Sequence, residues 1–398
     1  MSKWLPTLSM MLISMISYID RNTLALLAPT LMRDTHLNAE QYGFVVTAFS
    51  IVYMFGNPIW GRILDRIGVR AGMASAVLIW SVASACHAFA TGFRSFAAAR
   101  AVLGFGEGAT FPGGLRTVLQ TLPPHQHSRG TALAYSGGAL GALITPIVVT
   151  PIAAAYGWRG AFWFTGAIGA LWLALWLVLA PRKNSAAQTT IQEPEISHKS
   201  PAAPKWTDKP VWGYIALYAL GALPTGFVMY ETSVYLSGAL HKSQLEIGHV
   251  LWIPPLGWEA GYFFWGWVCD RVARARNPYS ARQKQFLWLT LLGLVVMVVP
   301  RIESFAIVML ALFFEMFVAA GFIIGSVAYA TSHYSTRHAG LIAGIGAGSW
   351  SAMVGVAMPG FGRLFDLHDY QAAFSGVALF PLLGYIAWRL LSRSEAAI

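Results

Sequence analysis

An acid and an arginine stand side by side within the first long apolar stretch, in the sequence Tyr18-Ile19-Asp20-Arg21-Asn22. Each charge costs at least about 2.5 to 3.5 kcal/mol at the centre of a lipid-facing helix, so neither side chain is expected to face lipid. Successive helical residues point about 100° apart, which makes two neighbours a poor ion pair. We therefore expect Asp20 and Arg21 each to have a partner on another helix, either for a function or as a purely structural pair.

A second charged segment follows at residues 100–112, which read RAVLGFGEGATFP. Arg100 and Glu107 are seven residues apart and share one face of a helix, and the glycines beside Glu107 allow neighbouring helices to pack closely. In a low-dielectric site a carboxylate beside an arginine stays ionised, whereas an isolated buried carboxylate takes a proton. An incoming anion that binds the arginine would free its acid partner to be protonated, and this arrangement would couple the two events.

Membrane helices must position these charges. Of the 398 residues, 56% are hydrophobic and only 11% are charged, against about 25% charged in soluble proteins. The mean hydropathy is +0.55. The sequence therefore predicts an all-α membrane protein, with spans of about 20 residues each. We predict twelve spans, at residues 6–30, 41–63, 71–91, 95–120, 129–155, 158–180, 211–235, 247–269, 284–300, 304–333, 339–362 and 370–391.

Residues 181–210 interrupt the apolar pattern. Pro, Ala, Ser, Gln and Lys dominate there without an apolar period, as in a flexible linker. The linker separates a predicted six-helix bundle at 1–180 from a second one at 211–398. Many secondary transporters consist of two such parallel repeats, with the substrate between them.

A short sequence recurs in the two halves. Gly61, Asp65 and Arg66 follow the second span, and the same Gly-x-x-x-Asp-Arg pattern returns with Asp270 and Arg271 after the eighth. We expect the glycine to permit close helix approach, the aspartate to cap or pair near a helix end, and the arginine to anchor at the inner surface. The segment is either a latch of a gate or a topology anchor.

The basic residues predict the orientation. With both termini inside, 18 of the 27 lysines and arginines fall on inner segments, six on outer segments and three within spans. This bias follows the positive-inside rule. The net charge of +10 is therefore topological, and we expect no nucleic-acid partner. No cleavable signal is evident at the start of the first span, so we predict a multi-pass inner-membrane protein with cytoplasmic termini.

The segment 61–70 (GRILDRIGVR) resembles the loop signature of the major facilitator superfamily, and the YIDRN and RAVLGFGEGATFPG segments resemble its anion:cation symporter family. The resemblance implies twelve transmembrane helices in two six-helix pseudo-repeats. It also implies that Arg21 binds the substrate carboxylate, that Asp20 and Glu107 are protonatable, that Arg100 supports their charge network, and that Tyr53 binds the substrate.

The second half departs from the sugar-acid members of that family. Residues 136–138 (SGG) lack the polar amide, and residues 346–351 (GAGSWS) lack the asparagine, that galactonate-type members carry. Acids appear in other spans instead, at Glu231, Glu259 and Glu315. A buried unpaired carboxylate is costly unless protonated.

These second-half residues are expected to complete the site. We predict Glu231 and Glu315 as proton-coupling groups, and Tyr230, Glu231, Ser349 and Trp350 as substrate-binding groups. Protonated acids that only serve helix packing are the competing interpretation.

The sequence thus predicts a proton-coupled symporter of a small organic anion, such as a sugar acid, that works by alternating access. The alternatives are an efflux antiporter or facilitator and, in another class, a membrane-embedded enzyme or receptor. No nucleophile–base pair or metal-ligand spacing is present, so we expect no enzyme, no metal and no cofactor other than the coupling proton. We expect a monomer in the bilayer.

Overall fold

The computed structural model describes residues 3–123, 126–180, 204–334 and 338–392, and these residues form helices and their connections without a strand. The prediction of an all-α protein is confirmed. The chain divides into two compact units, residues 1–198 and 199–398. Most of the predicted linker at 181–210 lies outside the described residues. Only its last part, residues 204–210, is described.

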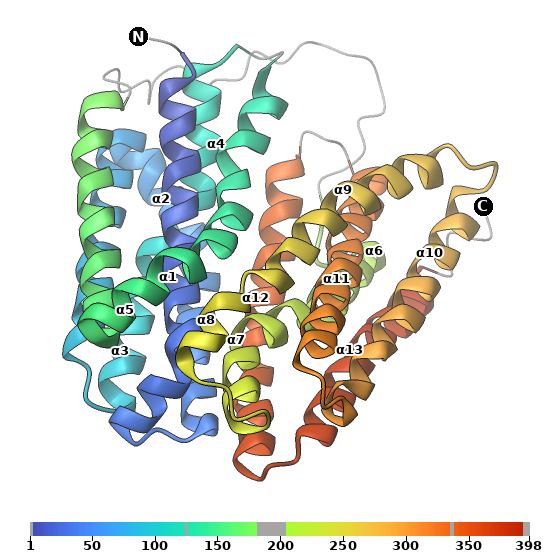
Figure 1. Ribbon diagram of the computed structural model, residues 1–398. Coiled ribbons are helices and arrows are strands. Elements are labelled where there is room, and N and C mark those ends of the chain that lie inside the picture. Colours follow the sequence, from blue (N-terminus) through green and yellow to red (C-terminus); the bar gives the residue numbers. More distant parts are fainter. Residues whose placement is uncertain (1–2, 124–125, 181–203, 335–337, 393–398) are drawn as a thin grey trace. The chain divides into compact units, whose positions relative to one another are not determined.

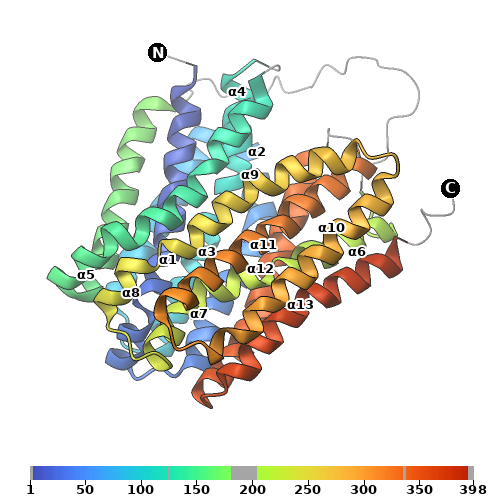
Figure 2. The ribbon, with the colours of Figure 1, turned by 45° about the vertical axis from the view of Figure 1, so that its right-hand side comes forward.

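In the described part of the first unit, five α-helices, which Figure 1 labels, and one short 3-10 helix follow one another along the chain. They are α1 (Leu5–Thr35), α2 (Ala39–Cys86), η1 (His87–Phe89), α3 (Phe93–Glu107), α4 (Thr110–Thr121) and α5 (His127–Leu179). Within this unit α1 packs along α5, and α2 packs along α3, as the two views in Figures 1 and 2 both show.

Two of these helices are too long for one span. At 1.5 Å per residue, the 48 residues of α2 are about 72 Å long, against a hydrocarbon core of about 30 Å. Each helix contains one glycine with a positive φ, Gly68 in α2 (φ 80°) and Gly157 in α5 (φ 69°). Other residues rarely adopt this conformation. Thus α2 and α5 supply two predicted spans each, and α3 with α4 supplies the fourth.

The second unit also groups into six spans, made by α6 with α7, α8 with α9, α10 with η3, and α11, α12 and α13. Their bounds are α6 (Lys209–Gly221), α7 (Leu223–Gly238), α8 (Gln244–Val250), α9 (Ile253–Ala273), α10 (Pro278–Gly293), η3 (Leu294–Arg301), α11 (Phe305–His333), α12 (Ala339–Asp366) and α13 (Tyr370–Leu391). Within the unit, α9 and α10 lie beside α11 (Figure 2). The grouping agrees with the twelve predicted spans.

Seven helical stretches of the described chain are long and apolar enough to cross a membrane. Two of the seven are the double-length stretches at Ala39–Phe89 and Arg129–Leu179, which hold two predicted spans each. The helix α1 is not among the seven. It carries Asp20 and Arg21 on its buried face instead.

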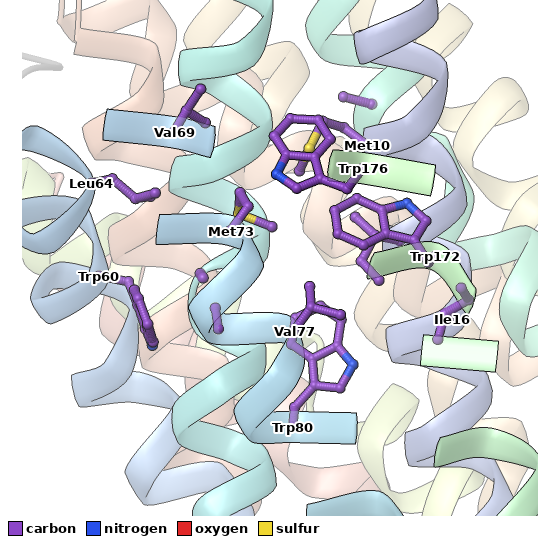
Figure 3. Close-up of a cluster of buried hydrophobic side chains, with 14 of the residues drawn as sticks. Met10, Ile16, Trp60, Leu64, Val69, Met73, Val77, Trp80, Trp172 and Trp176 are labelled. Carbon is purple, nitrogen blue, oxygen red and sulfur yellow. The ribbon is translucent and has the colours of Figure 1, made fainter. Parts of the chain in front are cut away.

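Tryptophans hold the first unit together around one apolar cluster (Figure 3). Trp172 and Trp176 of α5 stack with their ring centroids 5.2 Å apart. The indole N–H of Trp172 donates to the carbonyl of Ser9 on α1 (2.7 Å), and that of Trp176 donates to the carbonyl of Arg70 on α2 (3.0 Å). The second half of α5 is therefore fixed to both of its neighbours by paired polar and apolar contacts.

The recurring segment at 61–70 differs from the prediction. It continues as helix to Ile67 and breaks only at Gly68, so most of the segment that resembles a loop signature is helical. A Cβ at Gly61 would meet nothing within 4 Å, so the expected close approach is wrong within this unit. Tight approach occurs elsewhere, for example at Gly104, where a Cβ would lie 2.5 Å from the carbonyl oxygen of Phe49.

Candidate functional site

Arg21 of α1 forms a buried ion pair with Glu107, the last residue of α3. The guanidinium Nε donates to Glu107 Oε2 at 2.6 Å, and the hydroxyl of Ser17 donates to the same oxygen at 2.8 Å. Arg21 is 5% exposed and Glu107 is 0% exposed. Charge-assisted hydrogen bonds of this length are strong, and burial removes competing water. The expectation that Arg21 has its partner on another helix is confirmed.

Asp20 occupies a separate hydroxyl environment. Its Oδ1 accepts a hydrogen bond of 2.6 Å from Ser84 of α2, and Ser84 lies 2.6 Å from the hydroxyl of Thr165 on α5. All three side chains are buried. The Oδ2 atom of Asp20 has no hydrogen-bond partner among the described residues. Asp20 and Glu107 are thus two buried carboxylates with different kinds of partner.

Aromatic rings surround the Arg21 guanidinium. Its central carbon lies 5.0 Å from the ring centroid of Tyr18, 4.8 Å from that of Phe49 and 4.4 Å from that of Tyr53. Arg100, which is fully buried, lies 4.5 Å from the same Phe49 ring. Cation–π contacts of this kind are stronger when they are desolvated. Phe49 therefore connects the two buried arginines.

Tyr53 adds a polar atom beside this cage. Its ring stacks on Phe49 with centroids 5.5 Å apart. Its hydroxyl is buried and finds no hydrogen-bond partner in the described part of the chain, and the same holds for Glu107 Oε1. Buried polar atoms are usually paired, so these two atoms are candidates for contacts with a ligand or water.

Glycines bring Glu107 to this place. A Cβ at Gly106 would lie 2.7 Å from Cβ of Trp80, and one at Gly108 would lie 2.8 Å from the backbone of Gly56. Together with Gly104, these positions let the backbone of α3 touch α2. Directly after Glu107 the helix is interrupted, and α4 begins at Thr110.

The predicted gate residues of the first unit lie near the break at Gly68 in the middle of α2, and this segment contacts other helices. Asp65 forms an ion pair with Arg116 of α4. Arg70 donates to the carbonyl of Ala180 at 3.2 Å, and Arg66 is exposed. Sequence reasoning assigned Arg116 only to a span and missed this pairing, because the relative rotation of α2 and α4 is not readable from one sequence.

The repeat copy of that segment has other contacts. Asp270 and Arg271 are exposed at the end of α9, and the guanidinium of Arg271 lies 3.7 Å from the ring centroid of Trp267. The recurrence in sequence therefore does not reproduce the contacts of the first unit.

The second unit buries two of the three predicted acids. Glu231 of α7 is 0% exposed, and neither of its carboxyl oxygens has a hydrogen-bond partner within the described ranges. Glu315 of α11 is 2% exposed and faces α10, where a Cβ at Gly293 would lie 3.7 Å from its Oε1. Glu259 is half-buried on α9, and Tyr230 is buried beside Glu231 on α7.

Ser349 and Trp350 of α12 use their hydrogen-bond donors within the second unit. Ser349 donates to the carbonyl of Gly346 at 2.8 Å, and the indole of Trp350 donates to the carbonyl of Ala222 at 2.9 Å. Ala222 lies at the break between α6 and α7. Pro224 stands in the first turn of α7, where proline is tolerated because its missing N–H would have no helical partner there. Trp350 therefore fixes this break, and its substrate contact stays a prediction.

Four side chains of the first site were missed in the sequence. Ser17 could have been found, since it lies one helical turn before Arg21 on the same face. Phe49, Ser84 and Thr165 gave no signal, because single hydroxyls and aromatics occur throughout the spans.

The helices, the buried charge pair and the two units define a multi-pass membrane transport protein. Residues 10–283 match the family model of the Major Facilitator Superfamily, and the chain belongs to this superfamily. This result confirms the predicted superfamily and the prediction of a transporter rather than an enzyme.

Known proteins show the same relationship. The chain is 26% identical to the hexuronate transporter of Escherichia coli (strain K12) over 416 aligned residues, which cover 96% of this chain and 92% of that protein. It is 34% identical to a probable sulfoacetate transporter of Cupriavidus necator over 187 residues, 46% of this chain and 43% of the relative. A solved bacterial homologue of the human lysosomal transporter Spinster, inward-facing and occupied, has a TM-score of 0.76 at 15% identity, with 97% and 96% of the chains covered. The predicted major facilitator fold is confirmed.

Proposed function

We propose that this protein is a proton-coupled symporter that imports a small organic anion, of the sugar-acid class or a related carboxylate, by alternating access. The observation that carries the proposal is the buried Arg21–Glu107 pair within an aromatic cage. Asp20, the residue before Arg21, supplies a second buried carboxyl group. The hexuronate transporter that matches nearly the whole chain supports the sugar-acid class. The match to a probable sulfoacetate transporter supports the wider class of small anions.

Exchange of partners at Arg21 couples anion and proton in this proposal. The guanidinium is a planar fork that suits a carboxylate. An anion that binds it competes with Glu107, whose Oε2 now accepts from both Arg21 and Ser17. A carboxylate that loses its arginine in a desolvated site is costly, so Glu107 takes a proton as the anion binds. Release of the anion on the other side restores the pair and discharges that proton.

The other end of the anion meets the second unit. Tyr230 and Glu231 lie on α7, the repeat partner of α1, and both are buried. They form hydrogen bonds with hydroxyl or amine donors at the far end of the substrate, and Ser349 and Trp350 make further contacts with it. A ligand held at both ends draws the repeats together, which alternating access requires. Glu315 is a further proton-binding group of this unit.

The gate and the orientation complete the proposal. The Asp65–Arg116 ion pair acts as a latch near the break in α2, together with Arg66 and, in the second repeat, Asp270 and Arg271. The termini lie in the cytoplasm and the protein works as a monomer in the inner membrane, with the proton as its only coupling ion.

Uptake into proteoliposomes tests the proposal. Labelled hexuronate, aldonate and sulfoacetate are offered outside, with and without an inwardly directed proton gradient. We expect accumulation of at least one of these acids above its external concentration, and only with the gradient. Equal accumulation with and without the gradient would contradict proton coupling. Expulsion of the acids driven by the gradient would favour an antiporter instead.

A further inference from the structure

A chain of two hydroxyls leads from Asp20 away from the Arg21–Glu107 pair. Ser84 donates to Asp20 Oδ1 at 2.6 Å, and the oxygens of Ser84 and Thr165 are also 2.6 Å apart. Ser84 is 1% exposed and Thr165 is 0% exposed. The three groups come from three different helices, α1, α2 and α5. Buried hydroxyls at these distances form a continuous hydrogen-bonded row, which is the arrangement that conducts a proton.

The row has two possible polarities. Because the one hydrogen of Ser84 is donated to Asp20, Thr165 donates to Ser84 in that state. Thr165 also lies 3.1 Å from the carbonyl oxygen of Phe162, a second acceptor for the same hydrogen. When Asp20 is protonated and donates to Ser84, the row reverses, and the Thr165 hydrogen turns to Phe162. Both states are therefore satisfied without any movement of the backbone.

His87 lies one helical turn beyond the hydroxyls, toward the end of α2. Its ring stacks on Phe162 with centroids 4.9 Å apart and an interplanar angle of 15°. Its Nδ1 lies 2.7 Å from the carbonyl oxygen of Ala83, an atom that only accepts, so Nδ1 carries the hydrogen. Nε2 is then a bare acceptor, and it is buried without a hydrogen-bond partner among the described residues. Phe89, two residues on, is already 68% exposed.

We propose that Asp20 exchanges its proton through Thr165 and Ser84, with His87 at the entrance, along a route between α2 and α5 that is separate from the anion-binding Arg21. This inference rests on the proposed proton-coupled transport. Nε2 of His87 accepts a proton from the end of the helix and passes it through a water to Thr165, which lies three residues after Phe162, the ring on which His87 stacks. Thr165 accepts the proton, its own hydrogen passes to Ser84, and that of Ser84 passes to Asp20. Each hydroxyl gains one hydrogen and loses one.

The charged groups that face this route belong to α1 and α3. Arg100 faces both Asp20 and His87, and Glu107 faces Asp20. Arg21, next in sequence to Asp20, is held by Glu107. On the α2 and α5 sides the facing groups are the hydroxyls and His87 itself. The route therefore allows Asp20 to be protonated while the anion occupies Arg21.

Three substitutions with two matched controls test the relay. Thr165→Val and Ser84→Ala remove single hydroxyls of the row, and His87→Phe keeps the stacked ring but no nitrogen. The controls remove buried hydroxyls that lie outside the row, at Ser81 of α2 and Thr150 of α5, by Ser81→Ala and Thr150→Val. We expect each relay variant to slow proton-driven uptake at least about tenfold, which is less than the roughly 10²- to 10⁴-fold that a positioned proton-transfer group contributes in catalysis. Counterflow exchange of labelled acid at equal pH should fall by a much smaller factor than proton-driven uptake, because exchange needs no net proton transfer.

Several outcomes would overturn the relay. If Thr165→Val takes up the acid at the parent's proton-driven rate, the relay is contradicted. Slow uptake in Ser84→Ala alone would then mean only that Ser84 orients Asp20. Equal losses in the two controls would point to packing instead. Thr165→Ser keeps the hydroxyl and should restore uptake, and it covers the case in which Thr165→Val fails to fold. If the parent itself shows no proton-driven uptake, the proposed function fails, which is a different result from a relay variant that matches a coupled parent.

Discussion

Arg21 has a buried counterion of its own. Its Nε contacts Glu107, and three aromatic rings lie within 5.0 Å of its guanidinium carbon. A buried charge without a partner would be costly. In the proposed function, the anion therefore replaces the contact with Glu107, and selectivity for anions begins with this competition between two carboxylates.

The first prediction is that Arg21→Lys weakens anion binding at least about tenfold, or about 1.4 kcal/mol. Lysine keeps the charge but presents a single point donor instead of a planar fork. The dissociation constant of a transported acid for folded protein in detergent measures the effect. Arg33→Lys is the matched control, because Arg33 is 76% exposed. If Arg21→Lys binds the acid with the affinity of the parent, Arg21 is not the residue that binds the substrate carboxylate.

The second prediction concerns Glu107 and Asp20. Glutamine at 107 still accepts from Arg21 and Ser17 but cannot carry a proton, and asparagine at 20 can still accept from Ser84. Glu107→Gln and Asp20→Asn should therefore abolish accumulation driven by a proton gradient and keep exchange at equal concentrations. Glu303→Gln, an exposed acid, is the control. If both variants still concentrate the acid, the coupling groups lie elsewhere, and Glu231 and Glu315 become the next candidates.

At the scale of helices, the glycines of α3 decide how close α2 and α3 come. A Cβ at Gly104 would lie 2.5 Å from the carbonyl oxygen of Phe49, a distance that real Cβ atoms essentially never show, and this oxygen belongs to the backbone. Phe49 also carries the ring between Arg21 and Arg100. A shift of this helix pair would thus move the charge network itself.

The third prediction compares two glycines with the same substitution. Gly104→Ala should destabilise the protein by about 1 to 3 kcal/mol, the usual cost of overpacking, and should reduce anion binding as well. Gly61→Ala should be neutral, since its Cβ meets nothing within 4 Å. Thermal unfolding in detergent measures both. Equal stability of the two variants would contradict the packing argument.

The fourth prediction addresses the pair between α2 and α4. Asp65 is 59% exposed and Arg116 is 30% exposed, so the pair contributes only about 0.2 to 1 kcal/mol to stability. A latch should nevertheless govern rate: Asp65→Arg and Arg116→Asp should each change the uptake rate, and the double reversal should restore it. Arg94→Asp, at another exposed position, controls for net charge. No recovery in the double variant would favour a topology anchor.

The sequence predicted the helices well because their signals are local. Apolar length, proline and glycine mark each span, and Arg21 had to find a partner because lipid excludes its charge. The contacts between helices were harder. Gly61 was expected at a close approach that Gly104 makes instead, and the hydrogen bond from the indole N–H of Trp350 to the carbonyl of Ala222 was not foreseen. Which faces meet depends on the rotation of each helix, and a single sequence does not record it.

At the scale of the whole molecule, both units bury acids, but among the described residues only the first pairs a buried acid with an arginine. The first unit buries Arg21 and Arg100 with Asp20 and Glu107 and pairs Arg21 with Glu107, whereas the second buries Glu231, Glu315 and Arg282, whose guanidinium donates to the hydroxyl of Ser332 at 3.2 Å. Neither of these two acids forms an ion pair among the described residues. The repeats have therefore diverged in chemistry. Within the proposed function, the first unit holds the anionic end of the substrate, and the second offers acceptors to its neutral end.

The fifth prediction tests this division of roles. Glu231→Gln keeps the size and hydrogen-bonding shape of the side chain but removes the acid, and it should change selectivity across a panel of acids that differ only in the far-end group. Acids with a far-end amine or several hydroxyls should lose the most, because a carboxyl accepts from such donors more strongly than an amide does. Glu315→Gln is the matched control: it is a buried acid of the same unit, but it faces Gly293 of α10. The Glu315→Gln variant can differ from the parent in the number of protons transported per substrate, but it should rank the acids in the same order as the parent. If Glu231→Gln ranks the panel as the parent does, Glu231 does not contact the far end, and the anion is selected by the first unit alone.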